Sequence, residues 1–204
     1  GKSQGRLEAL LEGLPVEVTP TCPSLYTLKV ESLGHLTGNV IANAALSIAG
    51  TPFRAEGTLL LTDWGVSGPA TLRLSSYAAR HLAENGFTGT LVINWLDRNE
   101  DEARSLLRPE GPKLLCNRVP AGLTAKVWTH IVERAGLRPD IRCSEVGAKG
   151  INRLVSTSVA DTYPITGRAK FKSEFVTCGG VSLGSINLKT LEAAEVPGLF
   201  FAGE

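Results

Sequence analysis

Strand-like segments follow one another in this chain without the regular helical crossovers of a parallel sheet, and this feature restricts its fold most. Apolar or alternating stretches at residues 26–33, 53–62 and 88–95 each indicate a strand. The periodicity of the apolar, small residues at 38–48 does not distinguish a helix from a strand, and the neighbouring strands favour a strand there. Among these four stretches, a helix is expected only between the third and the fourth, at 53–62 and 88–95. Because parallel strands need a long crossover between each pair, we expect an α+β protein with an antiparallel sheet or β-barrel.

The character of the sequence changes after Leu96, where helical patterns replace strand patterns. Helical periodicity appears at 98–107, 120–135 and 144–162. Strand patterns return afterwards, at 163–168 and 172–177. The chain therefore divides into an N-terminal start at 1–19, a β-barrel from 20–96 and 162–177, a helical subdomain at 97–161, and a return segment at 178–204.

The charge balance limits the kinds of partner. The chain has 21 Lys and Arg against 20 Asp and Glu, a net charge of +1, and these charges are scattered along it. Because phosphate contacts need clustered basic residues, this balance predicts no nucleic-acid partner. No apolar run approaches the ~20 residues of a membrane-spanning helix, so we expect no membrane partner.

The four cysteines are too far apart in the sequence to form a C-x-x-C pair. Cys22, Cys116, Cys143 and Cys178 are therefore expected to be reduced thiols, which indicates a reducing, cytoplasmic compartment. Neither the cysteines nor the three histidines have the spacing of zinc ligands. We expect no metal site.

The letters GVSGP around Ser67 invite comparison with the nucleophile elbow of hydrolases, which reads G-x-S-x-G. The fifth position is Pro69, and nothing in the sequence connects Ser67 with His35, His81 or His130. The simpler interpretation makes Ser67 the N-cap of a helix with Pro69 in its first turn. His81 and His130 are then expected to be exposed on helices.

Two glycine-containing turns near the C-terminus carry the strongest functional pattern. Cys178-Gly179-Gly180 follows an apolar strand pattern, and a second apolar run ends in Ala202-Gly203-Glu204. Glycine lets the backbone approach a ligand closely, and a carboxylate accepts hydrogen bonds from sugar hydroxyls. Either turn alone is explained by an ordinary β-turn. Together they indicate a cofactor-binding segment, and with Gly1 at the start of the chain they favour a piece of a longer flavoprotein.

Four segments in order resemble the BaiN-like flavoproteins, bacterial oxidoreductases described as NAD(P)/FAD-dependent or aminoacetone-oxidase-like. These segments are TDWGVSGP at 62–69, YPITG at 163–167, TCGGV at 177–181 and PGLFFAGE at 197–204. The resemblance runs from about residue 23 to the C-terminus. It implies an insert within a Rossmann-type FAD domain, consisting of a translation-factor-like β-barrel with a small helical subdomain.

The resemblance also implies FAD as the cofactor of the parent protein, with NAD(P)H as a candidate electron donor. In the family the Gly-Gly-Val turn lies beside the flavin, which points to Gly179, Gly180 and Val181. The family's Gly-Glu pair reaches the ribityl or ribose part, which points to Gly203 and Glu204. No G-x-G-x-x-G fingerprint for the pyrophosphate occurs in this chain, and Cys178 replaces a residue that is usually small, such as Ala.

The function implied is that of the insert of an FAD-dependent oxidoreductase, which covers the flavin and shapes the substrate pocket. Its expected partners are the FAD-binding domain of the same parent chain and a small-molecule substrate, and the insert alone is expected to be inactive. Arg153, Tyr163 and Arg168 are candidate substrate-facing groups or ordinary surface residues, and no catalytic residue is assigned. The alternative function is a β-barrel binding module for protein or RNA.

Overall fold

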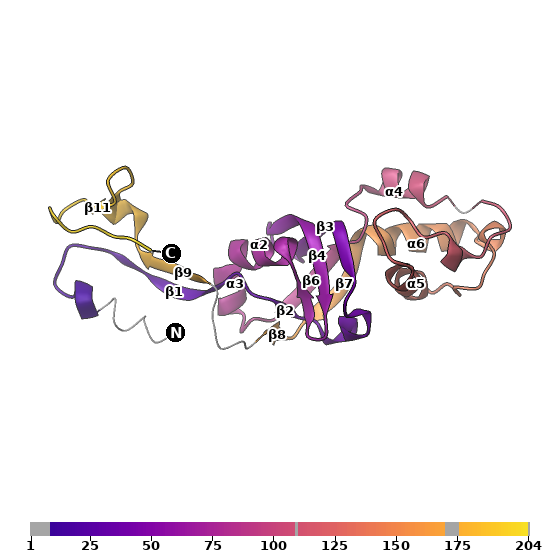
Figure 1. The fold of residues 1–204 in the computed structure, drawn as a ribbon, viewed down its shortest axis with the longest axis horizontal. Helices are drawn as coiled ribbons and strands as arrows, with labels where there is room; N and C mark the ends of the chain where they lie inside the picture. The colour runs from indigo at the N-terminus through magenta and orange to yellow at the C-terminus, as the bar shows by residue number, and fades with distance from the viewer. Residues whose placement is uncertain (1–8, 109, 170–175, 204) are drawn as a thin grey trace.

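An antiparallel sheet of seven strands forms the centre of an elongated molecule (Figure 1). The structure is a computed structural model and describes residues 9–108, 110–169 and 176–203. A two-stranded ribbon with the C-terminal segment lies at one end of the sheet, and a helical lobe lies at the other. Every pair of described strands is antiparallel, which confirms the α+β fold class.

The central sheet closes on itself through one short stretch of chain. Its strands are β2 (Leu28–Lys29), β3 (Val40–Ile48), β4 (Arg54–Thr62), β5 (Gly65–Ser67), β6 (Gly89–Asn94), β7 (Asp161–Ile165) and β8 (Gly167–Arg168). Their order is β7-β6-β3-β4-β5-β2-β8. The two edge strands are consecutive in the chain with only Thr166 between them, so a continuous segment borders both edges and gives the sheet a barrel-like form.

Apolar side chains from the inner face of the sheet form a core that continues into the helical lobe. Ile41 of β3, Leu59 of β4 and Ile93 of β6 are almost completely buried in it. Helix α2 (Pro69–Tyr77) packs against β4 and β3 and buries Leu74, and α3 (Ala79–Glu84) follows directly. Each buried side chain of this size stabilises the fold by about 1.5–3 kcal/mol relative to exposure.

The segment around Ser67 begins its helix one residue later than predicted. Gly68 occupies the N-cap position with φ 89° and makes no side-chain cap, and Pro69 is the first helical residue. Ser67 instead ends β5, a three-residue strand too short for its pattern to be visible in the sequence. The strand predicted at 26–33 is also shorter, because the 3-10 helix η1 (Glu31–Leu36) replaces its second half.

The helical lobe, defined here as residues 97–160, is built around α4 (Glu100–Leu106), α5 (Ala125–Arg134) and α6 (Ala148–Ala160). The helix predicted at 120–135 begins later than expected, since Thr124 caps it by accepting a hydrogen bond from the Val127 N–H. Two loop segments of the lobe are held together by main-chain hydrogen bonds, such as Leu115 N to Ile141 O at 2.9 Å. The lobe therefore has ordered connections as well as ordered helices.

The ribbon at the other end pairs β1 (Val18–Ser24) with β9 (Val176–Val181), apart from the central sheet. After β9 come the 3-10 helix η4 (Leu183–Ser185) and the short strands β10 (Ile186–Asn187) and β11 (Glu192–Ala193). Most of the strand predicted at 172–177 lies outside the described residues. None of the helices in the described part of the chain has both the length and the apolar character needed to cross a membrane.

Gly65 makes a backbone contact that leaves no room for a side chain. A Cβ atom there would lie 2.3 Å from the Val30 nitrogen and 2.4 Å from the Leu28 oxygen, and φ is +145°. We expect Gly65→Ala to lower the free energy of unfolding by about 3 kcal/mol or more, measured by urea denaturation.

The control for this variant is Gly50→Ala. Gly50 has φ +74°, but an added Cβ would have no contact within 4 Å. This control should lose only the ~1 kcal/mol typical of a left-handed non-glycine residue. Equal losses in the two variants would show that the close approach at Gly65 is unimportant.

Candidate functional site

The glycine pair expected beside a flavin lies in β9, where its main chain presses against β1. Gly179 has φ +101°, and a Cβ atom there would lie 2.4 Å from the carbonyl oxygen of Pro20. Gly180 is buried, has φ +110° and pairs with Thr19. Val181 pairs with Val18 in the same ribbon. The contact with β1 is therefore sufficient to require glycine at 179.

Gly203 has open surroundings, in contrast to Gly179. Its φ is +130°, and a Cβ atom there would meet nothing within 4 Å. The segment that leads to it is joined to the β1 side of the ribbon, since Glu17 N donates to Ser185 Oγ at 3.0 Å. Glu204 lies outside the described residues. The described members of the proposed cofactor set thus belong to one end of the molecule, where the main chain at Gly203 has space for a ligand.

Cys22 and Cys178 lie directly opposite each other in the ribbon. Both are free thiols. Burial, followed by the neighbouring Cys178, raises the pKa of the Cys22 thiol above its usual value. Because the thiolate is the reactive form of cysteine, this environment gives no support to Cys22 as a nucleophile.

The three candidates for substrate contact lie in three different environments. Tyr163 is buried where the barrel meets the lobe. Arg153 is exposed on α6, where its Nη1 would lie 3.6 Å from a Cβ at Gly136. The guanidinium carbon of Arg168 lies 4.9 Å from the ring centroid of Phe87. The structure therefore does not gather these residues into one pocket.

The environment of Ser67 gives no support to a hydrolase. Its hydroxyl accepts a hydrogen bond from the Thr27 hydroxyl at 2.9 Å, and its carbonyl oxygen accepts one from the Thr71 hydroxyl at 3.0 Å. His81 is half-buried beside Phe53, with 5.8 Å between ring centroids. Among the described histidines, none hydrogen-bonds to Ser67, so the base that a serine nucleophile needs has no counterpart here.

A chain of polar side chains joins the barrel to the helical lobe, and we call Trp95, His130, Arg134, Asp161 and Tyr163 the polar junction. Asp161, at the start of β7, is only 3 % exposed. Its carboxylate accepts hydrogen bonds from Trp95 Nε1 at 3.2 Å and from Arg134 Nη2 at 2.8 Å. The Tyr163 hydroxyl also donates to it. The junction therefore connects Trp95, directly after β6, with β7 and α5.

The hydrogen bonds of the polar junction assign the proton positions on His130. The Tyr163 hydroxyl gives its proton to Asp161, so His130 Nε2, 2.8 Å from that hydroxyl, must be the donor to it. A neutral His130 then accepts at Nδ1 from His35 Nε2, 3.1 Å away. This tautomer satisfies both nitrogens of His130.

The protonation states make the polar junction a structural clamp. Burial, followed by the neighbouring His35, lowers the pKa of His130 to about 4. Burial and then the Asp161 charge raise the pKa of Tyr163 well above its usual value. General acid–base catalysis works best with a pKa near the operating pH, and these two groups are moved away from neutrality. The arrangement suits holding the lobe in place better than transferring protons.

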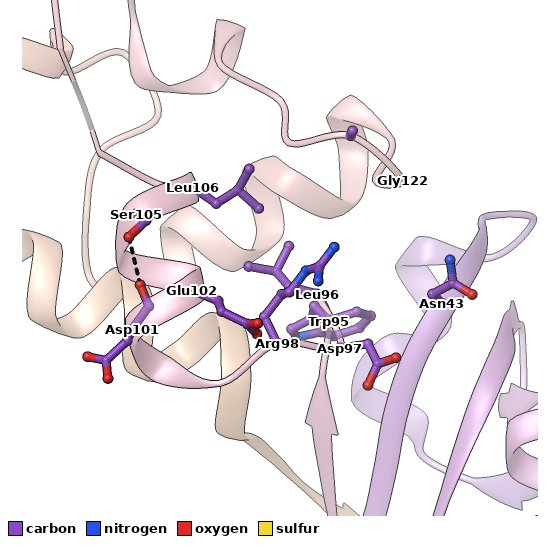
Figure 2. Close-up of a pocket in the computed structure, with 11 residues that line it drawn as sticks. Asn43, Trp95, Leu96, Asp97, Arg98, Asp101, Glu102, Ser105, Leu106 and Gly122 are labelled. Atoms are coloured by element: carbon purple, nitrogen blue, oxygen red, sulfur yellow. Dashed lines mark hydrogen bonds between the residues drawn. The ribbon is translucent and has the colours of Figure 1, made fainter.

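A hollow of about 740 Å³ opens beside the polar junction, between the barrel and α4 (Figure 2). Its lining includes Asp97, Asp101 and Glu102 against the single cation Arg98. The Ser105 hydroxyl donates to the Asp101 carbonyl oxygen at 2.9 Å on the α4 side. This excess of carboxylates disfavours phosphate or any other anionic group at this position.

Metal binding finds no support in the described residues, since no three His, Cys, Asp or Glu side chains among them are grouped so that they could hold an ion.

Sequence reasoning missed the polar junction and was wrong about His130, which is only 9 % exposed. Its members come from the end of β6, where Trp95 is the next residue, from α5 and from β7, so no short motif contains them. One signal was present, since His130 lies three residues after Val127 and therefore on the same face of α5. That spacing could have identified His130 as buried.

Comparisons with known proteins agree with this architecture. A family model described as HI0933-like protein barrel and H2TH domain matches residues 22–176. The chain is 28 % identical over 204 residues to a ribosomal RNA dihydrouridine synthase of Escherichia coli and 26 % identical over 196 residues to one of Haemophilus influenzae. These alignments cover 96 % and 94 % of this chain but 48 % and 46 % of the relatives. The chain thus spans about half the length of the curated relatives it matches.

The buried imidazole of His130 should make the protein less stable in acid. Its pKa is about 4 in the folded protein against an ordinary 6.5, so the unfolded chain binds the proton first as the pH falls. Its contribution to stability is complete above pH 6.5 and is lost between 6.5 and 4, by up to about 3 kcal/mol. His35, Arg134, Tyr163 and Asp161 surround it, and only the Asp161 charge favours protonation.

Urea unfolding at several pH values measures this effect. His130→Gln should flatten the dependence of the unfolding free energy on pH between 6.5 and 4. His81→Gln, at a half-buried histidine outside the polar junction, should keep the slope of the unmodified protein. An unchanged slope in His130→Gln would exclude His130 as its source.

Proposed function

Because the chain belongs to the HI0933-like family, whose barrel and H2TH domain it contains, we propose that it is the insert of an FAD-dependent oxidoreductase. We further propose that the complete enzyme forms dihydrouridine in ribosomal RNA, the activity named for the two relatives. Since this chain aligns with only 48 % and 46 % of those relatives, the activity is assigned to the longer protein.

The observation that carries the placement of a further domain is the set of exposed apolar side chains in the segments at the β1–β9 end of the molecule. Several large apolar side chains are exposed there, and Leu10 and Leu183 are 73 % and 69 % exposed. The others are Leu14, Leu188, Leu191 and Phe200. Large apolar areas on a protein surface usually mark an interface. The occupant we propose is the FAD-binding domain of the same parent chain, because the matched relatives are about twice as long.

The residues at this end fit part of an FAD site. Gly203 offers main-chain groups beside open space, and Gly179 and Gly180, which form part of strand β9 and not the turn expected from the sequence, let β9 approach β1 closely. We propose that Gly179, Gly180, Val181 and Gly203 contact the cofactor and that Glu204 accepts hydrogen bonds from its hydroxyls. FAD, when bound and reduced, supplies the hydride chemistry, with NAD(P)H proposed as the electron donor.

The substrate of this reaction is a base within RNA. Dihydrouridine is uridine with a saturated C5–C6 bond, so its formation takes up one hydride and one proton. The proposal departs from the sequence-based expectation of a small-molecule substrate and no nucleic-acid partner, and it follows the name of the relatives. The part assigned to this chain is to hold the FAD-binding domain at one end and to orient the RNA.

A gene deletion tests the function directly. Dihydrouridine in purified ribosomal RNA, measured by mass spectrometry of the nucleosides, should disappear when the gene for this chain is deleted and return when it is supplied again. Dihydrouridine that survives the deletion would overturn the proposed reaction. Binding of RNA by a gene product that forms no dihydrouridine would favour the alternative, a β-barrel binding module.

Substitution at Gly203 tests the proposed contact between this residue and FAD. In the complete gene product, Gly203→Val should weaken flavin binding by about tenfold or more, measured as bound flavin per protein after dialysis. Gly198→Val is the matched control, since both glycines are exposed with positive φ and neither would place a Cβ within 4 Å of another group. Equal flavin contents would contradict contact at Gly203. The isolated chain of 204 residues should hold no stoichiometric flavin.

A further inference from the structure

Positive charge is concentrated in the helical lobe although the whole chain is nearly neutral. The helical lobe as a whole has eleven Lys and Arg against eight Asp and Glu, a formal charge of +3. The excess lies after its acidic start, since residues 103–160, from the second turn of α4 to the end of α6, include ten Lys and Arg against four Asp and Glu, a formal charge of +6. The rest of the chain has eleven against sixteen, a formal charge of −5. The net charge of +1 therefore hides two regions of opposite sign.

Half of the eight acidic residues of the lobe lie together at its start, on the side of the barrel. Glu100, Asp101 and Glu102 form the first turn of α4, where negative charge stabilises a helix N-terminus. Asp101 and Glu102 line the hollow next to the barrel together with Asp97 (Figure 2). These carboxylates lie apart from the cations of residues 103–160. We call the surface formed by residues 103–160, which is predominantly basic, the basic surface.

The cations of this basic surface are accessible and mostly uncompensated. All ten are exposed. Arg108, Arg134 and Arg138 form ion pairs with Glu110, Asp161 and Asp140. Seven others form no ion pair with any described residue: Arg104, Lys113, Arg118, Lys126, Arg142, Lys149 and Arg153.

Several of these cations come from segments that are neighbours in space. Lys113 and Arg142 belong to two loops that pair with each other. Cys143 N donates to the Lys113 carbonyl oxygen at 2.9 Å, and Leu114 and Arg142 form an isolated antiparallel β-bridge. Arg153 lies beside the turn at Gly136 that ends α5. Figure 1 shows the start of α6 and the loop before it at the outer end of the lobe, away from the central sheet. The basic surface therefore includes the part of the lobe that is most accessible to a large partner.

We propose that this basic surface of the helical lobe docks the phosphate backbone of the ribosomal RNA. Lys and Arg bind phosphates by charge without reading the sequence, and the affinity falls steeply with salt as counterions are released. The inference rests on the proposed function, which supplies RNA as the polyanion. Because the central sheet separates the lobe from the proposed flavin end, the lobe positions the RNA and does not contact the reacting base.

Filter binding of the complete gene product to transcribed ribosomal RNA tests this docking. The lobe variant combines Lys113→Gln, Arg118→Gln, Arg142→Gln and Lys149→Gln. The control combines Arg54→Gln, Arg73→Gln, Arg80→Gln and Lys189→Gln, which removes the same charge at four exposed positions outside the lobe. Urea unfolding of both variants verifies that they are folded.

The lobe variant should bind RNA about tenfold or more weakly, and its slope of log K against log salt should be less steep by about 3. The control variant should stay within about twofold of the unmodified protein. Equal losses in the two variants, full affinity in the lobe variant, or no RNA binding by the unmodified protein would overturn the proposal. Tighter binding to vesicles of anionic phospholipid than to RNA would also overturn it.

These outcomes are separable from those of the proposed reaction. An enzyme that forms dihydrouridine while its lobe variant keeps full RNA affinity would leave the reaction intact and remove the docking surface. An enzyme that binds RNA through the lobe but forms no dihydrouridine would leave the docking surface intact and remove the reaction.

Discussion

The buried carboxylate of Asp161 determines how the helical lobe is held on the barrel. A charge that is almost inaccessible to water costs several kcal/mol unless it is paired and hydrogen-bonded. Trp95 and Tyr163 donate to this carboxylate from the barrel side, and Arg134 donates from α5. The charge is fully compensated only when α5 occupies its place. The Asp161 carboxylate of the barrel therefore has all its partners only when the lobe is correctly packed.

Local patterns were sufficient to predict much of the fold. Strands at 40–48, 54–62 and 89–94 and helices at 100–106 and 148–160 agree with the predicted segments within a few residues. Most of these segments have a clear apolar periodicity, whereas the strand at 40–48 was predicted from the strands beside it. The patterns failed where few residues carry the element. β5 has three residues, and the chain bends into η1 after a β2 of only two, lengths at which pairing with distant strands outweighs any local preference.

The candidate site was less accessible to sequence reasoning. Gly179 could be identified as a special position, but the pattern could not show that its close neighbour is the Pro20 carbonyl. His130 was taken for a surface residue because its partners His35 and Tyr163 are remote in the chain. The basic surface was also missed, because a sum of charges over the whole sequence averages regions that the fold separates.

The path of the chain into and out of the lobe has a further consequence. The lobe leaves the barrel just after β6 and returns at β7, and Ile93 and Asp161 are partners in the pairing of these strands. An inserted lobe whose two ends are already adjacent costs the barrel little loop-closure entropy. It also leaves the remaining strand pairs of the barrel unchanged. Descendants of this architecture can therefore lengthen, replace or recharge the lobe while the barrel stays the same, so the surface of the lobe and the scaffold can evolve at different speeds.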